Sequence, residues 1–579
     1  MTDTRLASSQ VQGLDASDPY NREAQTFPVL TPEQAARVAA FGEEEAVAGG
    51  GFLFRRGERS VDFFLVLDGA VEITDPKPDG TEGVIHVHRA NQFTGEIDLF
   101  NDREILVNGR AAGPTRVVRV PRAEFRRLIT AEPDIGEIVM RAFILRRVGL
   151  IQHTQGGAVL VGSQRHPDTL RIERFLSRNG YPHRTVDSDA DPDAASFIEG
   201  WGVDEDDLPV VVMGGGQVLR NPPTPALADM LGMTEAIEAD HVFDLVVVGA
   251  GPAGLASAVY GASEGLDTVV IEGLAPGGQA GTSSKIENYL GFPTGISGQA
   301  LAGRAQVQAQ KFGAKMMVSR RVEGLACERL PYRIALEGGG EIRGRSVVIA
   351  TGATYRTLDV ADYERFENAG IHYAATAIEA NLCEGAEVVV VGGGNSAGQA
   401  AVFLSGKAAH VHVLVRGEGL AASMSDYLVQ RIDASPRITL HNQTEIVGVH
   451  GERFLEAVTW RHRVTGAEER QPVAGLFVMI GAVPNTGWLH GCVPLDRGGF
   501  VHTGADEEGL ALPSPYQTVK PGIYAVGDVR AGSVKRVASG VGEGSVVVQA
   551  VHGWLASTQA HGGEAEPAPV TDGERVAAE

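Results

Sequence analysis

Two glycine-rich turns, each preceded by a run of valines, constrain the fold of this chain more than any other feature. Residues 246–254 read VVVGAGPAG and residues 388–397 read VVVVGGGNSA. Helix-compatible stretches follow the turns, at 255–264 and 399–405. A buried strand that turns tightly into a helix brings backbone N–H groups close to a pyrophosphate. The sequence therefore predicts an α/β fold with two Rossmann-like domains, each of which holds a dinucleotide.

The residues that follow each turn predict which nucleotide binds there. After the first turn, the apolar run 268–271 ends in Glu272, whose carboxylate can accept hydrogen bonds from ribose hydroxyls, as FAD or NAD requires. After the second turn, the run 410–415 ends in Arg416, a cation that suits a 2′-phosphate and favours NADPH. A solvated surface arginine is the alternative, and NADH then remains an option. The predicted contacts within the turns are Gly249, Gly251, Pro252, Ala253 and Gly254 for the first nucleotide, and Gly392, Gly394, Asn395, Ser396 and Ala397 for the second.

From residue 241 to 555 the chain resembles the low-molecular-weight thioredoxin reductase family. The shared segments are Gly277-Gly278-Gln279, Ile286-Glu287-Asn288, Ala350-Thr351-Gly352-Ala353, residues 475–478, Pro484-Asn485-Thr486 and residues 522–528. The resemblance implies an FAD-binding domain at 240–358 and 488–556, split by an inserted NAD(P)H-binding domain at 359–487.

The same resemblance implies roles for residues around the flavin. Asp528 is expected to bond the ribityl chain, and Asn288 is expected near the isoalloxazine ring. Further FAD contacts carried over from the family are Gly278, Gln279, Thr351, Gly352, Gly527, Arg536, Val537 and Ala538. Members of the family are homodimers, so a homodimer is expected here.

The chain departs from this family at its redox motif. Just before the second glycine turn, where the family has Cys-x-x-Cys, this chain has Ala374 and Ala377, and alanine cannot store electrons. The three cysteines, Cys327, Cys383 and Cys492, lack redox-motif spacing, and each is interpreted as a small buried apolar residue. Cys383 lies closest to the missing pair, with Glu379 as a candidate acid beside it. No catalytic residue is assigned, and a resident dithiol relay is not expected.

Composition favours a large soluble protein. The 579 residues leave room for several domains, and a hydrophobic content of 43% is sufficient for their cores. A formal net charge of −23 argues against nucleic acid as a partner. No apolar run approaches the roughly twenty residues of a membrane helix. The polar start, residues 1–10, lacks a signal-peptide core, so a cytoplasmic location is expected. No metal site is predicted.

Residues 20–150 resemble a cyclic-nucleotide-binding β-roll that becomes helical from Arg122. The segment Gly95-Glu96-Ile97 falls at the phosphate cassette, but Ile105 stands where an arginine should meet the cyclic phosphate. Arg103 and Arg110 are close in sequence, yet neither is in register. Because this contact is charge-assisted, its loss favours a structural or partner-docking role over nucleotide binding.

Residues 155–235 resemble a thioredoxin or glutaredoxin-like fold, with Pro209 at the family's cis-proline position. The expected Cys-Pro-x-Cys aligns with residues 166–169, which contain no cysteine, and a docking role is therefore predicted. His166 could act as an acid or ligand, although a solvated helix-start histidine is the more common case. The composition of residues 557–579 predicts a disordered tail.

The predicted function is that of an FAD-dependent NAD(P)H oxidoreductase whose reduced flavin donates directly to an outside acceptor. The candidate electron acceptors are a quinone, dioxygen and an electron-carrier protein. One alternative is a thioredoxin-disulfide reductase that acts on a thioredoxin-like partner. The other is a regulatory flavoprotein that senses redox state or a nucleotide.

Overall fold

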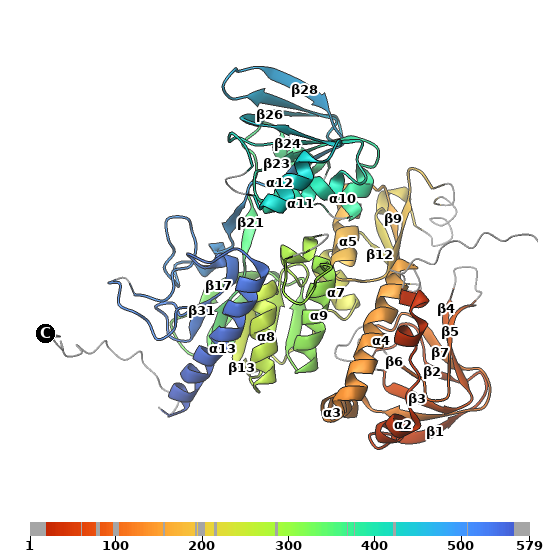
Figure 1. Cartoon of the computed structure of the whole chain (residues 1–579). Coiled ribbons are helices and arrows are strands. Elements are labelled where there is room, and N and C mark those ends of the chain that lie inside the picture. The colour runs from red at the N-terminus through yellow and green to blue at the C-terminus, as the bar shows by residue number, and fades with distance from the viewer. Residues whose placement is uncertain are drawn as a thin grey trace, which may run out of the picture. The chain divides into compact units, whose positions relative to one another are not determined.

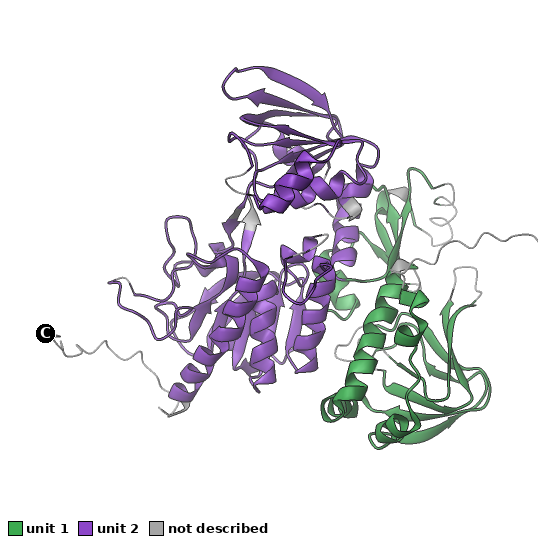
Figure 2. Ribbon diagram, in the orientation of Figure 1, with its two compact units in different colours: residues 1–164, 180–233 green, residues 165–179, 234–579 purple. Residues whose placement is uncertain are grey.

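The computed structural model describes residues 19–560 except 60, 77–81, 96–103, 154–156, 192–193, 195–202, 214–216, 284–285, 287, 368, 374, 376, 421–423 and 507. The chain forms two compact units, which Figure 2 distinguishes by colour. Residues 1–164 and 180–233 form the first unit, and residues 165–179 and 234–579 form the second. Within the described residues, none of the helices combines the length and apolar character that a bilayer span requires.

The first unit contains a β-roll built from two four-stranded antiparallel sheets, in the strand orders β1-β8-β3-β6 and β2-β7-β4-β5 (Figure 1). Its strands are β1 (Glu43–Val47), β2 (Phe52–Phe54), β3 (Phe63–Asp68), β4 (Ala70–Pro76), β5 (Glu82–Arg89), β6 (Phe93–Gly95), β7 (Asn108–Ala111) and β8 (Thr115–Val120). The flanking helices are α1 (Glu23–Thr26), α2 (Pro32–Ala39), α3 (Arg122–Ala131) and α4 (Pro133–Gln152). The predicted change from strands to helix at Arg122 is confirmed.

A second small sheet in the first unit has the order β10-β9-β11-β12. Its strands are β9 (Ala158–Gly162), β10 (His183–Asp187), β11 (Val210–Val212) and β12 (Val218–Arg220), and α7 (Thr224–Met230) follows them. The Leu208–Pro209 peptide bond is cis, as predicted for Pro209. Between β9 and β10 in the sequence, α5 (Pro167–Arg178) belongs to the second compact unit. The side chain of His166 caps this helix by accepting a hydrogen bond from the Asp168 N–H.

The second unit begins with a five-stranded parallel sheet of order β16-β15-β14-β20-β31. These strands are β14 (Leu245–Val248), β15 (Thr268–Glu272), β16 (Lys315–Val318), β20 (Val347–Ile349) and β31 (Ile523–Ala525). Three helices pack against this sheet, namely α8 (Pro252–Ser263), α9 (Gly298–Lys311) and α13 (Val537–Ala560). A smaller sheet lies on its other face and contains β13 (Val242–Phe243), β17 (Val322–Ala326), β18 (Tyr332–Leu336) and β19 (Glu341–Gly344).

Alternation along β14 explains why this sheet is covered on both faces. Val246 and Val248 join the core shared with the smaller sheet, whereas Leu245 and Val247 join the core shared with the helices. All four side chains are buried, so a continuous apolar strand is required rather than one that alternates with polar residues. The helix α13 continues to Ala560, so residues 557–560, which the sequence predicts as part of the tail, are helical.

An inserted segment repeats the same plan with a second parallel sheet of order β22-β29-β23-β24-β25. Its strands are β22 (Ile371–His372), β23 (Glu387–Val391), β24 (His410–Leu414), β25 (Ile438–His441) and β29 (Gly475–Val478). The helices α10 (Ala377–Leu382), α11 (Asn395–Leu404) and α12 (Asp426–Asp433) accompany it, together with a sheet of β26 (Thr444–His450), β27 (Ala457–His462) and β28 (Glu468–Pro472). Two paired strands link it to the rest of the unit, β21 (Ala353–Tyr355) and β30 (Ala482–Pro484).

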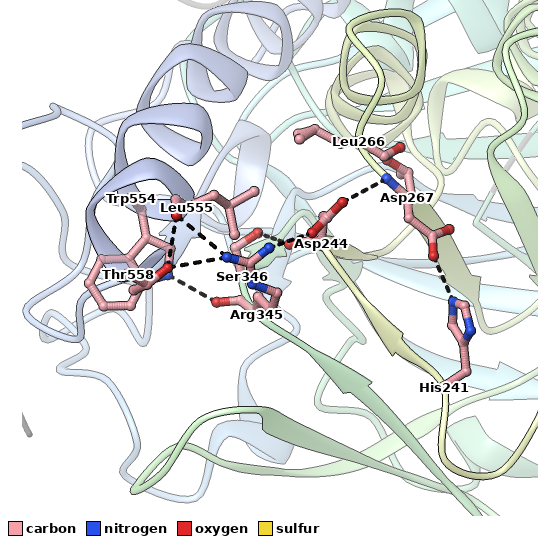
Figure 3. A network of polar contacts seen from close by, with 10 residues as sticks. His241, Asp244, Leu266, Asp267, Arg345, Ser346, Trp554, Leu555 and Thr558 are labelled. Carbon is pink, nitrogen blue, oxygen red and sulfur yellow. Dashed lines mark hydrogen bonds and ion pairs between the residues drawn. The ribbon is translucent and has the colours of Figure 1, made fainter. Parts of the chain in front are cut away.

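At the amino ends of the first parallel sheet, a polar network centred on Asp244 joins the strands to α13 (Figure 3). The Asp244 carboxylate accepts hydrogen bonds from Arg345 at 2.9 Å and from the Asp267 N–H at 3.2 Å. The Ser346 hydroxyl donates to the Asp244 carbonyl at 2.5 Å. The Trp554 indole in turn donates to the Arg345 carbonyl at 3.0 Å. The network therefore fixes the strand ends that lie opposite the glycine turn.

We expect Asp244→Ala to lower the free energy of unfolding by about 1–3 kcal/mol, because it leaves a half-buried arginine and an N–H group without their acceptor. Urea denaturation followed by circular dichroism measures the change. Asp240→Ala, at an exposed position nearby, serves as the control and should stay within about 0.5 kcal/mol of the native chain. Equal losses in the two variants would contradict the role of the network.

Candidate functional site

The three glycines of the first turn lie in two kinds of environment. A Cβ atom at Gly249 would lie 2.4 Å from the Ala350 carbonyl oxygen, and one at Gly254 would lie 1.9 Å from the Gly249 oxygen. At Gly251, by contrast, the position of a Cβ has no protein atom within 4 Å. Two of the glycines thus permit close packing of helix and strand, and the middle one borders open space. This is the arrangement that a close approach of phosphate requires.

The helix after this turn begins earlier than predicted, at Pro252 rather than 255, because Gly251 is its N-cap. Proline suits the first helical position, since that residue has no intrahelical partner for an N–H group. The N-terminus of α8 therefore points its free N–H groups at the space beside Gly251.

Glu272 stands at the end of β15, beside the turn. Its carboxylate accepts hydrogen bonds from the Ala250 N–H at 2.8 Å and from the Leu274 N–H at 2.9 Å. These two bonds fix the carboxylate against the glycine turn. Each oxygen retains a further acceptor position, which leaves the group able to bond ribose hydroxyls.

Two distant segments predicted to contact FAD come to the same place. The Gly277 N–H donates to the Ala250 carbonyl at 2.7 Å, and a Cβ at Gly278 would lie 3.1 Å from the Gly251 Cα. The Gln279 amide donates to the Ala353 carbonyl at 2.6 Å. The segment 277–279 therefore forms one side of the open space at Gly251.

Thr351 and Gly352 follow β20, where the chain leaves for the inserted segment. The Thr351 hydroxyl donates to the Asn485 carbonyl at 2.8 Å, and the Asn485 amide donates back to the Thr351 carbonyl at 2.8 Å. Gly352 has a φ of +62°, which favours glycine. The outgoing and returning chains are thus bonded together beside the first site.

Asp528 lies in a short helical turn directly after β31, and a Cβ at the preceding Gly527 would lie 2.9 Å from the Ala253 Cβ. Burial raises the pKa of the Asp528 carboxyl above its usual value. Among the described residues, none donates a hydrogen bond to this carboxylate. A half-buried acceptor of this kind suits the hydroxyl groups of a ligand.

The sequence analysis missed Glu543, which holds this turn in place. Its buried carboxylate accepts a hydrogen bond from the Gly527 N–H at 2.6 Å and pairs with Arg530 at 2.6 Å. Glu543 is the one acidic residue in the sequence of α13, and an isolated acid in an otherwise uncharged helix was the signal that could have identified it.

The four remaining predicted flavin contacts, Asn288 and residues 536–538, differ in how well the structure connects them to this cluster. Val537 and Ala538 form the first turn of α13, which packs against α8 so closely that a Cβ at Gly544 would lie 2.1 Å from the Ala253 oxygen. Arg536 directly precedes that helix. Asn288 is exposed, and no hydrogen bond among the described residues joins it to the cluster.

The second glycine turn repeats the geometry of the first. A Cβ at Gly392 would lie 2.2 Å from the Met479 oxygen, whereas Gly394 has open space around that position. Gly394 is the N-cap of α11, so this helix also begins earlier than predicted, at Asn395. The buried Ala397 is the small residue that faces the strand, and Ser396 is exposed.

Two side chains flank the open space at Gly394. The Asn395 amide oxygen accepts a hydrogen bond from the Ser425 N–H at 2.7 Å, which ties the N-cap of α12 to the start of α11. Arg416 follows β24 by two residues and its side chain is exposed to solvent. The predicted position of Arg416 at the end of this strand is therefore correct, and its side chain is accessible to a ligand.

The helix α10, which begins at the second position of the family's redox motif, is joined to α5 by an ion pair. Ala374 falls outside the described residues, and α10 begins at Ala377. The Glu379 carboxylate is buried and pairs with Arg174 of α5 at 3.3 Å. Burial lowers the pKa of the neighbouring His372 to about 4. Burial also raises the pKa of Cys383 to about 12, so this thiol stays protonated at neutral pH.

The interpretation of each cysteine as a small buried apolar residue is correct in its burial for all three, but two of them are covalently paired. Cys327 and Cys492 form a disulfide, although they are 165 residues apart in the sequence. Spacing rules detect only cysteines that are close in sequence, whereas this pair is joined by the return of the chain to the first sheet. Cys383 is buried and free, as predicted.

In the β-roll, the cassette residues Glu96, Ile97 and Arg103 lie outside the described part of the chain. Ile105 is buried, and Arg110 pairs with Glu72 at 3.0 Å and Glu82 at 3.3 Å. The Arg110 charge is therefore already engaged within the roll.

The second unit thus has the fold of a protein with two Rossmann-like dinucleotide domains. Residues 243–544 match the family described as pyridine nucleotide-disulphide oxidoreductase, and the chain belongs to this family. Residues 44–132 match the cyclic nucleotide-binding domain. The chain is accordingly an FAD-dependent oxidoreductase that carries an additional N-terminal domain.

The proteins that this chain resembles include thioredoxin reductases and an NADH dehydrogenase. It is 32% identical to NADPH-dependent thioredoxin reductase 3 of Arabidopsis thaliana, over 59% of this chain and 66% of that protein. It is also 32% identical to the thioredoxin reductase of Mycoplasmopsis pulmonis, over 53% and 95% respectively. An NADH dehydrogenase of Bacillus subtilis is 32% identical over 57% and 62%. The thioredoxin reductase structure from Lactococcus lactis aligns with a TM-score of 0.50 and 26% identity, over 54% and 99%.

Enzymes of the thioredoxin reductase type use FAD and NADPH. The residues of the first site fit FAD, since they combine open space at a helix N-terminus with two half-buried carboxylates, Glu272 and Asp528. The second site fits a nicotinamide nucleotide, because Gly394 borders open space at the N-terminus of a helix. The exposed side chain of Arg416 is also accessible to a ligand.

We expect Gly251→Ala to fold normally and to raise the FAD dissociation constant by about tenfold or more, which corresponds to about 1.4 kcal/mol. The added methyl group meets no protein atom but would occupy the space beside the helix N-terminus. Fluorescence titration of the apoprotein with FAD measures the change. Gly303→Ala, at an exposed position in α9 with equally open surroundings, is the matched control. FAD binding of native strength in Gly251→Ala would refute the assignment.

Proposed function

We propose that this protein takes a hydride from NADPH into FAD and then passes electrons directly from the flavin to an outside acceptor. The observation that carries the proposal is the pair of glycine turns, each with open space at its middle glycine and at a helix N-terminus. Both turns belong to one compact unit. FAD supplies the electron storage when it is bound, and the protein supplies position and electrostatics.

At the first site, the backbone around Gly251 and the start of α8 would hold the pyrophosphate. Glu272 would accept hydrogen bonds from the ribose, and Asp528 would accept them from the ribityl chain. The first turn of α13, at Val537 and Ala538, would border the ring. Gly278 and Thr351 would close the remaining sides of the pocket.

At the second site, Gly394, Asn395 and Ser396 would hold the pyrophosphate of the nicotinamide nucleotide. The Arg416 guanidinium would pair with a 2′-phosphate, which is the basis for preferring NADPH. A negatively charged phosphate also benefits from the positive end of the α11 helix dipole.

Two observations support direct donation to an outside acceptor. The sequence has alanines at 374 and 377, so this segment offers no thiols for a relay. The nearby Glu379 of α10 is paired with Arg174 of α5, so another helix of the chain occupies the side of α10 that carries Glu379. A thioredoxin-like protein is the second candidate acceptor, favoured by the names of the thioredoxin reductases among the relatives, whereas the NADH dehydrogenase among them keeps NADH as a possible electron donor.

For the N-terminal β-roll we propose a structural or partner-docking role. Its match to the cyclic nucleotide-binding domain defines the type of fold. Of the two candidates for the missing cassette cation, Arg103 lies outside the described residues, and Arg110 is engaged by two glutamates. A cyclic phosphate would therefore have to compete with carboxylates that are already in place.

We expect Arg416→Ala to raise KM for NADPH by about tenfold and to leave KM for NADH nearly unchanged, because only NADPH carries the 2′-phosphate. Steady-state kinetics with either coenzyme and a quinone measures the two constants. Arg470→Ala, an exposed arginine on β28, is the control. Equal changes for the two coenzymes would remove Arg416 from this role.

Anaerobic titration with NADPH should reduce the flavin with two electrons and leave Cys327 and Cys492 oxidised, since direct donation needs no thiol. Absorbance measures the flavin, and alkylation followed by mass spectrometry measures the thiols. Uptake of four electrons, with both of these cysteines becoming alkylated, would overturn the proposal and favour a disulfide reductase.

A further inference from the structure

Helix α5 bonds to two separate parts of the second unit, the wall of the first site and the inserted segment. The helix contains 12 residues and is therefore about 18 Å long. The chain reaches it from β9 and leaves it for β10, and both of these strands belong to the first unit. A segment that is flanked in the sequence by the first unit thus becomes part of the second.

The C-terminal end of α5 is bonded to the wall of the first site. The Arg178 guanidinium donates a hydrogen bond to the Gly278 carbonyl at 2.8 Å, and Gly278 borders the open space of that site. The Asn179 amide donates to the Leu274 carbonyl at 3.2 Å. Leu274 in turn donates its N–H to the Glu272 carboxylate. This end of the helix is therefore fixed to the segment that faces the FAD-binding space.

The rest of α5 and the residue before its N-cap contact the inserted segment. Arg174 pairs with the Glu379 carboxylate of α10 at 3.3 Å. The Glu379 side chain is only 5% exposed, so its charge depends on this partner. The Arg165 guanidinium carbon lies 5.5 Å from the centre of the Phe454 ring, in the loop between β26 and β27. One helix thus connects the inserted segment with the first site.

Both ends of α5 are capped, which makes the helix a stiff connector. At its start, the Asp168 N–H donates to the His166 side chain, and Pro167 occupies the first helical position. At its end, the Asn179 amide also donates to the Phe175 carbonyl at 2.9 Å. Caps satisfy backbone groups that would otherwise fray, so the helix keeps its length under load.

The inserted segment has a second connection that is easier to bend. It leaves and returns through the paired strands β21 and β30, which contain three residues each. A connection of a few residues at the ends of elements is the usual form of a hinge. Because α5 bridges the same two parts by a separate route, it limits bending at this ribbon.

We propose that α5 is a strap that holds the second glycine turn in one position relative to the first, with Arg174 and Arg178 as its positioning residues. The strap rests on the proposed function. A segment that carried both a nucleotide and a dithiol would have to bring each of them to the flavin in turn. With alanines at 374 and 377, this segment has only the nucleotide to present, and one fixed arrangement serves that task.

The first test measures the rate at which NADPH reduces the flavin, by stopped-flow absorbance without oxygen on the full chain with FAD bound. We expect Arg174→Ala to lower the rate at saturating NADPH by about fivefold or more. The NADPH concentration that gives half the maximal rate should change less than about twofold, because the strap positions the segment and does not touch the nucleotide.

Arg174→Lys keeps a cation within reach of Glu379 and should retain most of the native rate, which a loss of general packing would not predict. Arg178→Ala releases the other end of the strap and should also slow reduction. The control is Arg127→Ala on α3, which removes an exposed ion pair with Glu124 and should leave the rate unchanged. Circular dichroism and the flavin absorbance spectrum verify that each variant folds and binds FAD.

The second test measures how freely the inserted segment moves. Spin labels are attached to Gln308→Cys on α9 and to Ala467→Cys between β27 and β28, two exposed positions. Cys383 is buried, and the other two cysteines form a disulfide, so the labels react at the new sites. Double electron–electron resonance should give a narrow distance distribution, which becomes about twofold broader with Arg174→Ala and stays narrow with Arg127→Ala.

Unchanged or faster flavin reduction in Arg174→Ala would overturn the proposal. A distribution that is already broad without Arg174→Ala, or that stays equally narrow with it, would also overturn the strap. If NADPH does not reduce the flavin of the native protein, the proposed function fails, whereas the distance measurement still decides whether α5 restrains the segment.

Discussion

The close approach of backbone to backbone at the first glycine turn is the constraint on which the second unit depends. Helix α8 can lie against β14 only because Gly254 has no side chain where it meets the Gly249 oxygen. Helix α13 packs closely against the same helix at Gly544, and the turn that contains Asp528 packs against it at Gly527. A Cβ atom at any of these contacts would separate the elements, so the two carboxylates and the helix N-terminus would no longer face one space.

The chain uses one architecture twice and gives the two copies different surroundings. In each copy, a buried parallel strand ends in a glycine turn, and the middle glycine borders open space. The first copy places the acids Glu272 and Asp528 around that space, whereas the second leaves the cation Arg416 beside it. This difference in charge, rather than any difference in fold, is the basis on which we propose FAD for the first site and a nicotinamide nucleotide for the second.

The successes and errors of the sequence predictions have a common physical origin. Strands and turns were predicted correctly where the signal was local, as in the valine runs before both turns. Both helices were predicted to begin several residues too late. The reason is that a glycine of each turn is also the N-cap of the helix, so the helix begins at the next residue. The Cys327–Cys492 disulfide and the contact between Glu543 and Gly527 were not predicted, since each joins segments whose proximity no local pattern encodes.

The sequence by itself determined the two nucleotide turns, the residue that ends each following strand and the replacement of the redox cysteines by alanine, because these depend on residue types at short spacing. Only the tertiary structure decided how segments 277–279, 351–352 and 527–528 meet at one turn. It also decided that Arg174 pairs with Glu379 and that two distant cysteines form a disulfide. Contacts of this kind follow from the packing of whole sheets and helices, which is a property of the folded chain rather than of any short segment.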